Sequence, residues 1–488
     1  MAKNLNSVIP AKAGYSPLYG GIYTNRFPIR ACPRPDRGSG MTTINIFIFI
    51  GLAGINLLGV FLPELGFDAL WYHLPLSKLL LARGQWYFPG GLYYYSAMPR
   101  LAEVISLPLF SLIGYHGPKL VQFFSGLITS LLIYRLAKRF TSDRLLSLTA
   151  ANLFYATWLV SWQSSSGYVD LVRTLFEMIA LYFLVEGKTT RRRLLTAGVF
   201  LGLAIGTKWQ ALGSLALYAL IFSPVILIPA LITASPWFLI AYHFTGNPVY
   251  PLFEKFMFAT QLSQVSVNFY SLQAIFSRIV SAPIFLTRPS EDFLSPVSGL
   301  VYLISFLGLL SSRRQIRQLA LLGILGTFYL LLTPPPSTRY YLPYLPAVVL
   351  AAIYLLSRLK DKIAILFITA CTISSFVVLA MRAGSYLKYL PYLTRSQDLN
   401  QFLASLSSRL PSTFIDSDGY VAKNLPPDGT YLIANLHNLY YFPYNFDHNS
   451  FADLAKRYDY LITKDADPSA ITGDLIHTNE IGIQIFKL

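Results

Sequence analysis

Residues 66–75 read GFDALWYHLP and follow the first long apolar segment of the chain, Ile44–Leu62. Asp68 therefore lies just beyond a segment that is long enough to cross a membrane. A carboxylate beside lipid is costly, so it is usually either solvated or part of a functional site. Trp71 and Tyr72 follow directly, which suits a segment at the membrane–water interface beside a cleft. Taken alone, Asp68 is either a solvated loop acid or a reactive group.

The composition places the chain among polytopic membrane proteins. Of its 488 residues, 54% are hydrophobic and 13% are charged, and the mean hydropathy is +0.48. A soluble chain of this length would not carry so many nearly continuous apolar runs. The excess of 39 Lys and Arg over 23 Asp and Glu is explained better by cytoplasmic loops than by nucleic-acid binding. Cys32 and Cys371 are far apart, so they predict neither a disulfide framework nor a metal site.

Apolar runs bounded by charged residues or proline predict an α-helical protein with about eleven transmembrane helices. The predicted spans are residues 43–62, 118–137, 145–162, 169–186, 193–207, 208–222, 225–242, 297–311, 318–333, 341–357 and 363–381. Leu101–Gly114 is short for a span, with Glu103 near its start and Pro108 inside it. It is expected to be an interfacial helix instead.

Short basic clusters predict the orientation of these spans. With eleven spans and the N-terminus inside, all four clusters fall on the cytoplasmic side, as the excess of Lys and Arg in cytoplasmic loops requires. The clusters occupy residues 135–144, 188–193, 313–317 and 358–362. The first loop, the SSSGYVD turn and the STRYYLP stretch then lie outside. The sequence thus predicts a multi-pass protein of the plasma (inner) membrane whose site faces the periplasm or cell exterior.

Three regions differ in composition. Residues 1–40 are rich in Pro, Gly and Arg, and their VIPAKAG string resembles the translated product of a bacterial intergenic repeat. They are expected to be a disordered tail, or an extension that precedes the true start at Met41. Residues 41–381 are expected to form the transmembrane domain with its outer loops. Residues 382–488 have a soluble composition with alternating segments such as YLIANL and YDYLITK, which predicts a small extracytoplasmic α/β domain.

Four sequence segments that could take part in chemistry lie on the predicted outer face: FDALWYHLP, SGYVDL, TGNPVYPLF and STRYYLPYLP. The first two supply Asp68 and Asp170, and the last supplies Arg339, whose planar guanidinium suits a phosphate or carboxylate. This set fits the transfer of a group from a lipid-linked phosphate. The acid would accept a proton from the incoming nucleophile, and the arginine would stabilise charge on the leaving phosphate.

Together with GLAIGTKWQAL and SPWFLIAYHFTGNPVYP, these strings make residues 44–381 resemble the type C (GT-C) glycosyltransferase superfamily. The nearest resemblance is to its bacterial branch related to protein O-mannosyltransferases and lipid A aminoarabinose transferases. It implies a GT-C-like fold, an inverting transfer, Asp68 as the catalytic base, Asp170 as a second acid, and Arg339 with Tyr340 at the lipid phosphate. Protein mannosyltransferases commonly carry two adjacent acids in the first loop, whereas Asp68 is followed by Ala69. This departure leaves the substrate class open.

Three further candidates each have a structural alternative. Lys208 either snorkels at a span end or contacts the donor phosphate. Glu103 either caps the interfacial helix or lines the acceptor cleft, and His73 is either an interfacial hydrogen bonder or a ligand. We assign Asp170, Glu103 and His73 to substrate binding, and Arg339, Tyr340 and Lys208 to the lipid phosphate. The six histidines show no HExxH or other close ligand spacing, so no metal is expected.

The sequence therefore predicts a membrane glycosyltransferase that moves a sugar from a polyprenyl-phosphate carrier to a lipid, glycan or protein acceptor. Besides these substrates, only membrane lipids are expected as partners, without nucleic acid or a cofactor. A membrane transporter or lipid flippase for envelope precursors is the alternative. Transporters tend to place charges near mid-membrane and to contain internal repeats, whereas the charges here lie at the outer boundary. A non-catalytic scaffold for envelope assembly is a third hypothesis.

Overall fold

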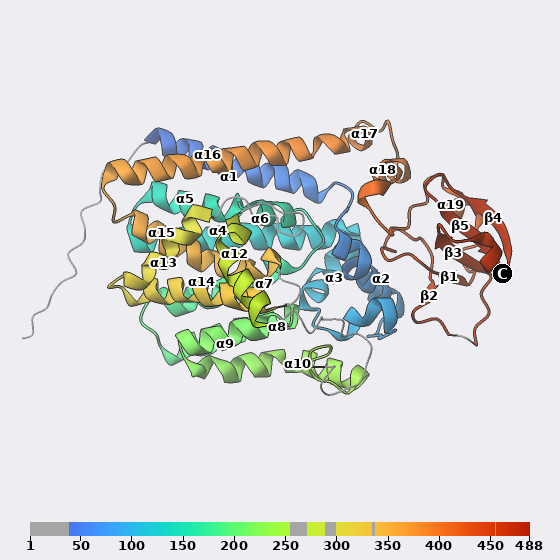
Figure 1. Ribbon diagram of the computed structural model, residues 1–488, viewed down its shortest axis with the longest axis horizontal. Coiled ribbons are helices and arrows are strands. Elements are labelled where there is room, and N and C mark those ends of the chain that lie inside the picture. The colour runs from blue at the N-terminus through green and yellow to red at the C-terminus, as the bar shows by residue number, and fades with distance from the viewer. Residues whose placement is uncertain (1–38, 254–270, 288–298, 334–336, 454) are drawn as a thin grey trace, which may run out of the picture. The chain divides into compact units, whose positions relative to one another are not determined.

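The computed structural model describes residues 39–253, 271–287, 299–333, 337–453 and 455–488, and these are mostly helical (Figure 1). The predicted extension at residues 1–40 therefore lies outside the described residues except for its last two, which begin the first helix. The longer helices are α1 (Ser39–Val60), α2 (Leu74–Arg83), α3 (Leu101–Ile113), α4 (His116–Thr141), α5 (Arg144–Tyr155), α6 (Trp158–Gln163), α7 (Asp170–Val185), α8 (Arg191–Thr207), α9 (Ala211–Ile221), α10 (Leu227–Thr245), α12 (Leu272–Thr287), α13 (Gly299–Phe306), α14 (Arg314–Leu332), α15 (Leu345–Leu356) and α16 (Asp361–Ser385).

Short helical turns connect or extend these helices. They are η1 (Ala69–His73), η2 (Gly91–Ala97), η3 (Pro224–Ile226), η5 (Leu307–Leu310), η6 (Thr338–Tyr344), η7 (Leu387–Tyr389), α17 (Leu390–Leu393), α18 (Leu399–Ser405), η8 (Ser407–Arg409), α19 (Tyr420–Asn424) and η9 (Pro468–Ala470). The turn η1 is π-helical. π-Helical turns are rare in proteins, and those that occur are often found at functional sites. This one directly follows Asp68.

Six helical stretches among the described residues are long and apolar enough to cross a membrane, or seven if the bent pair η2–α3 counts as one span. The six are Gly40–Val60, His116–Thr141, Pro224–Thr245, Arg314–Leu332, Thr338–Leu356 and Asp361–Leu393. The other five predicted spans coincide with shorter helices, α5 to α9 and α13. A multi-pass membrane protein is therefore supported, whereas the count of eleven spans stays a prediction.

The outward faces of these helices carry large apolar side chains. Leu112, Leu220, Ile228 and Leu366 are each at least 69% exposed. Exposed apolar surface of this extent is unfavourable in water but not in the acyl region of a bilayer. Helices also satisfy their own backbone polar groups, which lipid cannot do. Both features explain why this sequence folds into a bundle of helices.

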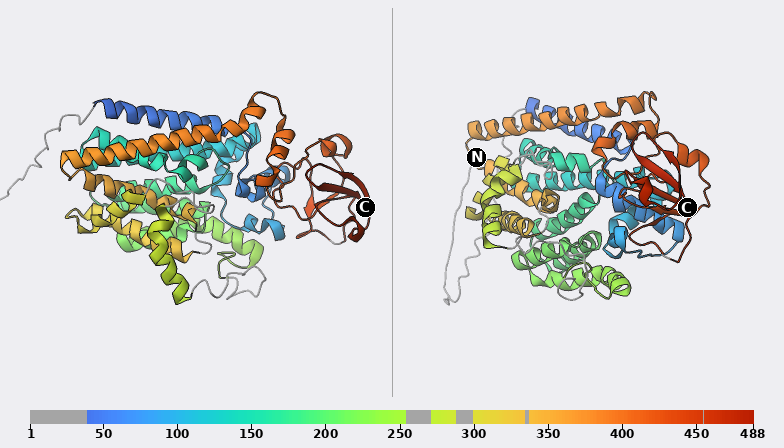
Figure 2. Two further views of the ribbon diagram at one scale, coloured as in Figure 1. Left: turned by 45° about the horizontal axis from the view of Figure 1, so that its top comes forward. Right: turned by 45° about the vertical axis from the view of Figure 1, so that its right-hand side comes forward.

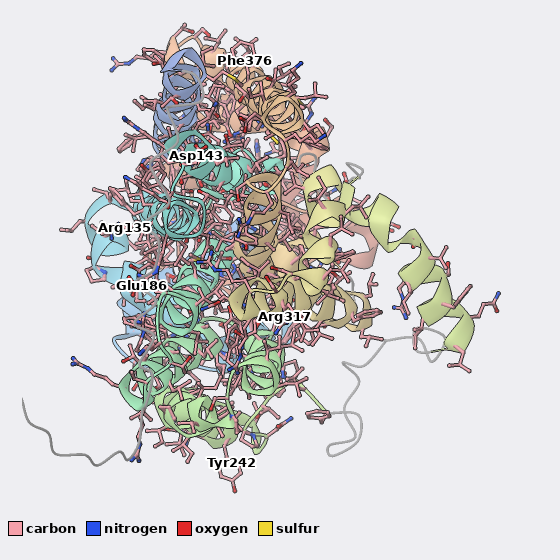
Figure 3. All side chains as sticks on the ribbon, turned by 90° about the vertical axis from the view of Figure 1, so that its left-hand side faces the viewer. Arg135, Asp143, Glu186, Tyr242, Arg317 and Phe376 are labelled. Carbon is pink, nitrogen blue, oxygen red and sulfur yellow. The ribbon has the colours of Figure 1, made fainter. Side chains whose placement is uncertain are left out.

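The four basic clusters meet at one end of the bundle, which faces the viewer in Figure 3 and carries the labels Arg135, Glu186 and Arg317. Nη1 of Arg139 lies 3.7 Å from Oε1 of Glu186, and Nη2 of Arg193 lies 2.6 Å from Oε2 of the same carboxylate, which links the first two clusters. Nη1 of Arg313 donates to the carbonyl of Phe140 at 3.3 Å. The side chains of Arg313 and Arg358 lie over the ring of Tyr354. The clusters thus share one face, as the sequence predicted.

The C-terminal region contains a mixed five-stranded sheet in the order β2-β1-β3-β5-β4. The strands are β1 (Tyr431–Ile433), β2 (Asp447–His448), β3 (Tyr460–Lys464), β4 (Asp474–Thr478) and β5 (Ile483–Lys487). β1 runs parallel to β2 and β3, while β5 is antiparallel to both β3 and β4. β1 and β3 lie in the two alternating segments noted in the sequence, which confirms a small C-terminal sheet region.

The first loop after α1 packs against this C-terminal region. Tyr72 and Tyr93 belong to the same buried apolar cluster as Phe414, Ile433 and Ile462 of the C-terminal region. Nζ of Lys78 donates to the carbonyl of Phe442 at 2.8 Å, and the hydroxyl of Tyr441 donates to the carbonyl of Glu64 at 2.9 Å. α1 and α16, which run side by side in both views of Figure 2, lead directly into these two regions. The C-terminal region therefore supports the loop that carries Asp68.

Candidate active site

Four charged side chains from four separate parts of the sequence form one ion-paired cluster. Nη2 of Arg339 lies 2.8 Å from Oδ2 of Asp68, and Nε of the same guanidinium lies 3.4 Å from Oδ2 of Asp170. Nζ of Lys208 lies 2.8 Å from Oδ1 of Asp170. Two carboxylates and two cations thus alternate in space. We call Asp68, Asp170, Lys208 and Arg339 the charged cluster.

The ends of helical elements position all four residues. Asp68 directly precedes η1, Asp170 begins α7, Lys208 follows α8, and Arg339 lies in η6. Charged groups are costly in the apolar middle of a span, so most of them meet at helix ends. The buried ion pair of Arg173 and Glu177 within α7 is an exception. The helix ends that carry the charged cluster lie away from the basic clusters, because α7 runs from Asp170 toward Glu186 and α8 returns to Lys208.

Neighbouring polar groups fix the orientation of Asp170. The backbone N–H groups of Leu171 and Val172 both donate to Oε1 of Gln122 on α4, at 3.1 Å. This satisfies donors at the start of α7 that have no partner within the helix. Nε2 of Gln163 donates to Oδ2 of Asp170 at 2.9 Å. Asp170 is therefore held from three directions, by Gln163, Lys208 and Arg339.

The members of the charged cluster differ in their access to solvent. The side chains of Asp68 and Arg339 are 18% and 21% exposed, whereas that of Asp170 is 1% exposed. Burial by itself raises the pKa of Asp68, but Arg339, His73 and Lys208 together lower that pKa below its usual value. Asp68 is thus a partly exposed carboxylate whose cationic neighbours favour its ionised form, while Asp170 is a buried counter-charge for Lys208 and Arg339.

Tyrosines surround the charged cluster. The hydroxyl of Tyr72 donates to Oδ2 of Asp68, and the hydroxyl of Tyr168 accepts from the backbone N–H of Asp68, both at 3.3 Å. The guanidinium of Arg339 lies 4.7 Å from the centre of the Tyr168 ring, and Nζ of Lys208 lies 5.4 Å from that of Tyr340. A cation placed over the face of an aromatic ring is attracted to that ring. The charged cluster thus has a polar and aromatic lining.

Glu64 ties together the two loops that carry Asp68 and Tyr168. It is 3% exposed, and its Oε1 accepts from the N–H of Gly66 at 2.7 Å while Oε2 accepts from the N–H of Gly167 at 2.7 Å. A Cβ atom at Gly66 would lie 2.6 Å from the Tyr168 ring, so only glycine permits this close approach. Glu64 therefore fixes the loop on which Asp68 depends.

His73 and Glu103 lie beside the charged cluster rather than within it. Both are buried, and Nδ1 of His73 is 2.7 Å from Oε1 of Glu103. They line a small cavity of about 10 Å³ that Tyr168 also lines. Neither Nε2 of His73 nor Oε2 of Glu103 has a hydrogen-bond partner among the described residues. The structure thus pairs these two predicted substrate ligands with each other, and their contact with substrate stays a prediction.

Five predicted site residues come together at the charged cluster: Asp68, Asp170, Lys208, Arg339 and Tyr340. Sequence reasoning missed Tyr72, Tyr168, Gln163 and Glu64. The four-residue spacing from Asp68 to Tyr72 was a usable signal, because residues four apart meet on one helix face. Gln163 and Glu64 gave no such signal, since their contacts depend on how separate loops pack. Among the described residues, no three His, Cys, Asp or Glu side chains gather as a metal site would require.

The sequence profile of the dolichyl-phosphate-mannose-protein mannosyltransferase family matches residues 109–245. No curated protein matches the chain. The structure is similar to ArnT from Cupriavidus metallidurans bound to undecaprenyl phosphate, with a TM-score of 0.61, 13% identity, and coverage of 90% of this chain and 97% of that one. The apo state of that ArnT gives a TM-score of 0.61, 14% identity, and coverage of 92% and 98%.

This chain has the fold of ArnT. The agreement extends over nearly the whole of both chains, so it includes the C-terminal region as well as the helix bundle. The archaeal oligosaccharyltransferase AglB from Archaeoglobus fulgidus, in complex with an inhibitory peptide and a dolichol-phosphate, is a weaker match, with a TM-score of 0.45 at 12% identity and coverage of 81% and 62%. The resemblance predicted from the sequence is confirmed.

Proposed function

We propose that this type C glycosyltransferase moves a sugar from a polyprenyl-phosphate carrier to an acceptor hydroxyl or amine, with Asp68 as the base. The observation that carries the proposal is the charged cluster, in which a reachable carboxylate and two cations meet at one end of an ArnT-like fold. A carboxylate that accepts a proton and cations that hold a phosphate are the two parts that this reaction needs.

The reaction is a single displacement at the anomeric carbon of the sugar. The acceptor oxygen or nitrogen forms a bond to that carbon, while the bond from the carbon to the phosphate oxygen breaks. The electron pair of the broken bond leaves with the phosphate, and the acceptor proton passes to the carboxylate of Asp68. One displacement inverts the configuration of the sugar.

Arg339 gives the cluster a way to couple carrier binding to base strength. In the structure its guanidinium is paired with Asp68 and Asp170. A phosphate can bind a guanidinium through two oxygens, so it competes with Asp68 for the same donors. When Arg339 turns to the phosphate, Asp68 loses the neighbour that lowers its pKa most, and it becomes a better base.

Lys208 and Asp170 complete the phosphate site. Lys208 is a second cation beside Tyr340, within reach of the same phosphate. Asp170 is buried, and it holds Lys208 and Arg339 in place through its two carboxylate oxygens. We therefore assign Asp170 a positioning role, in place of the direct substrate contact that the sequence suggested.

The transfer assay tests this proposal directly. The purified protein in phospholipid nanodiscs is incubated with undecaprenyl phosphate that carries a radiolabelled sugar, and transfer is measured to lipid, glycan and peptide acceptors. Asp68→Asn keeps the shape and the hydrogen bond from Tyr72 but cannot take up a proton, so transfer falls by about 100-fold or more. Carrier binding, measured separately, persists. Normal turnover by the Asn variant would remove Asp68 as the base.

We further propose eleven spans and an extracytoplasmic charged cluster in the plasma membrane. The gathering of the four basic clusters at the opposite end supports this orientation. In a chain with Cys32 and Cys371 replaced by serine, an impermeant thiol reagent applied to intact cells should label Asp428→Cys. It should not label Thr189→Cys or Ser312→Cys, which lie among the basic clusters. The reverse pattern would overturn the orientation.

The transporter alternative receives no support from the position of the charged cluster. Its residues lie at helix ends on one side of the bundle, whereas transporters place ionic groups near the bilayer midplane. Measurement of carrier movement across proteoliposomes separates the two functions. A transporter would move the lipid carrier across the membrane without transferring its sugar. Asp68→Asn would then not have the effect on sugar transfer that is expected when a base is lost.

A further inference from the structure

A second polar cavity lies on the other side of the loop that carries Asp68. Its volume is about 190 Å³, and it is lined by the end of α1, the residues just after α6, the end of α16, and η7 and η8. Three basic residues line it: Arg382, Lys388 and Arg409. We call it the α1–α16 cavity. None of the four residues of the charged cluster lines it.

Neutral oxygens hold Arg382 in this cavity. Arg382 is 3% exposed, and its Nε and Nη2 donate to Oδ1 of Asn56, at 3.3 and 3.2 Å. Nη2 also lies 2.8 Å from Oγ of Ser165 and 2.6 Å from the hydroxyl of Tyr386. Among the described residues, no Asp or Glu forms an ion pair with Arg382, Lys388 or Arg409. The guanidinium of Arg382 also faces the rings of Trp158 and Tyr386, at 5.7 and 5.0 Å from their centres. These contacts stabilise the charge but do not neutralise it, and a buried charge without an anion nearby is costly.

Glu64 is the acid that lines the cavity, and its carboxylate is already occupied. Its oxygens accept from the backbone N–H groups of Leu65, Gly66 and Gly167. Nζ of the buried Lys119 lies 3.9 Å away from it. Glu64 is therefore balanced by Lys119 and by three peptide dipoles, and the three cations of the cavity keep a net positive field.

Exposed apolar side chains adjoin the lining residues in the sequence. Leu58 on α1, Phe61 just after it, Met381 on α16 and Leu387 on η7 are all exposed. Both helices belong to stretches that are long and apolar enough to cross a membrane. Exposed apolar side chains beside a cationic cavity at a helix end match the two parts of an anionic phospholipid, with acyl chains along the helices and a phosphate above them.

We propose that the α1–α16 cavity binds the phosphate headgroup of an anionic membrane lipid. Arg382 is pre-oriented by Asn56, Ser165 and Tyr386 to point its charge at the phosphate. Lys388 and Arg409 are exposed and close over it from the side of the C-terminal region. The site goes beyond the proposed glycosyl transfer, because it needs neither the carrier nor Asp68. A bound lipid would also brace the loop at residues 64–66, which lines the cavity.

Lipid binding to the purified full-length protein in neutral detergent tests this inference. The probe is fluorescent phosphatidylglycerol, with phosphatidylcholine as the zwitterionic comparison. The test variant is Lys388→Ala with Arg409→Ala, because both side chains are exposed and their loss leaves the core intact. The matched control is Lys423→Ala with Arg457→Ala, which removes two exposed cations of the C-terminal region that do not line the cavity.

The native protein should bind phosphatidylglycerol more tightly than phosphatidylcholine. The Lys388/Arg409 variant should bind phosphatidylglycerol about 30-fold more weakly, as loss of two basic contacts to an anionic lipid implies. The control variant should bind it normally. Equal loss in both variants, or none in the first, overturns the site. If inorganic phosphate in the same molar excess displaces the lipid completely, the cavity takes a soluble anion and the lipid assignment is wrong. Sugar transfer is not part of this readout, so failure here is separate from failure of the proposed function.

Discussion

Arg339 and Arg382 lie on two sides of the same loop but in opposite surroundings. Arg339 is paired with two carboxylates, Asp68 and Asp170, and its side chain is 21% exposed. Arg382 is buried among neutral oxygens of Asn56, Ser165 and Tyr386. The first arginine already has anionic partners, so a bound phosphate would compete with Asp68 for its donors. The second keeps an unneutralised charge that a bound anion would satisfy. The presence or absence of a carboxylate partner thus distinguishes the arginine of the proposed catalytic site from the arginine of the proposed lipid site.

The largest expected effect comes from removing the buried counter-charge on one side of this comparison. Asp170→Asn leaves Lys208 and the Nε side of Arg339 without their buried carboxylate, and breaking a buried pair in this way costs about 3–5 kcal/mol. Arg382→Gln removes hydrogen bonds between a cation and neutral groups and should cost about 1.5–3 kcal/mol. The free energy of unfolding in mixed detergent micelles measures both. If Arg382→Gln were the more damaging change, the comparison would be reversed.

The shape of the Arg339 side chain should matter as well as its charge. Arg339→Ala loses two charge-assisted hydrogen bonds and should weaken undecaprenyl phosphate binding by about 100-fold or more. Arg339→Lys keeps the charge without the planar fork, so a loss of about 10-fold is expected. Arg457→Lys, at an exposed position of the C-terminal region, is the control for a general arginine effect. Unchanged carrier affinity in Arg339→Lys would show that the fork is not used.

The acid limb of the pH profile reports on the pairing of Asp68 with Arg339. Because Arg339 lowers the pKa of Asp68, the carboxylate stays ionised at a lower pH than an ordinary aspartate does. Transfer, and the stability that the ion pair contributes, should be present above the usual pKa and be lost as pH falls through the lowered one. In Arg339→Met the pKa of Asp68 loses this lowering, so the acid limb of the pH profile should move to higher pH. The value of kcat/KM for the carrier, which reports on the enzyme before the carrier binds, checks the direction over a pH series, and a shift to lower pH contradicts the assignment.

The smallest expected effect concerns the hydroxyl that supports the base. Tyr72→Phe removes a hydrogen bond to Oδ2 of Asp68 but leaves the ring stacked on Tyr95, 3.9 Å away. The loss of one such bond is worth about 0.5–1.5 kcal/mol, which corresponds to a roughly 2- to 10-fold lower rate. Tyr94→Phe, next to the same stack, is the matched control. Equal rates in the native protein and Tyr72→Phe would remove this hydroxyl from the reaction.

Much of the charged cluster was predictable because lipid restricts where charges can lie. Asp68, Asp170, Lys208 and Arg339 each adjoin an apolar run, so the sequence already placed them at span ends. The clustering of basic loops on one face followed from the same reasoning. Asp170 was predictable as a site residue but not as a buried one, since its burial depends on the packing of α4, α7 and α8 around it.

Other features left no readable pattern. The helices α5 to α9 are apolar but shorter than a typical span, so composition alone could not count the crossings. Arg382 sits at the end of an apolar run and looked like an ordinary domain boundary. Its neutral partners come from α1 and the segment after α6, which are 326 and 217 residues away in sequence. Such long-range contacts carry no local signal.

The sequence by itself determined that this is a multi-pass helical membrane protein, with its candidate acids and arginine at the ends of apolar segments and a small sheet region at the C-terminus. Hydropathy and charge decide these features, because a bilayer excludes charge and demands satisfied backbone groups. Only the tertiary structure decided which charges meet. It paired Arg339 with two acids, enclosed Asp170 and joined His73 to Glu103. Among the described residues, it left the three cations that line the α1–α16 cavity without an ion-paired carboxylate. Those outcomes depend on packing between distant segments, where a few ångströms separate an ion pair from an unneutralised charge.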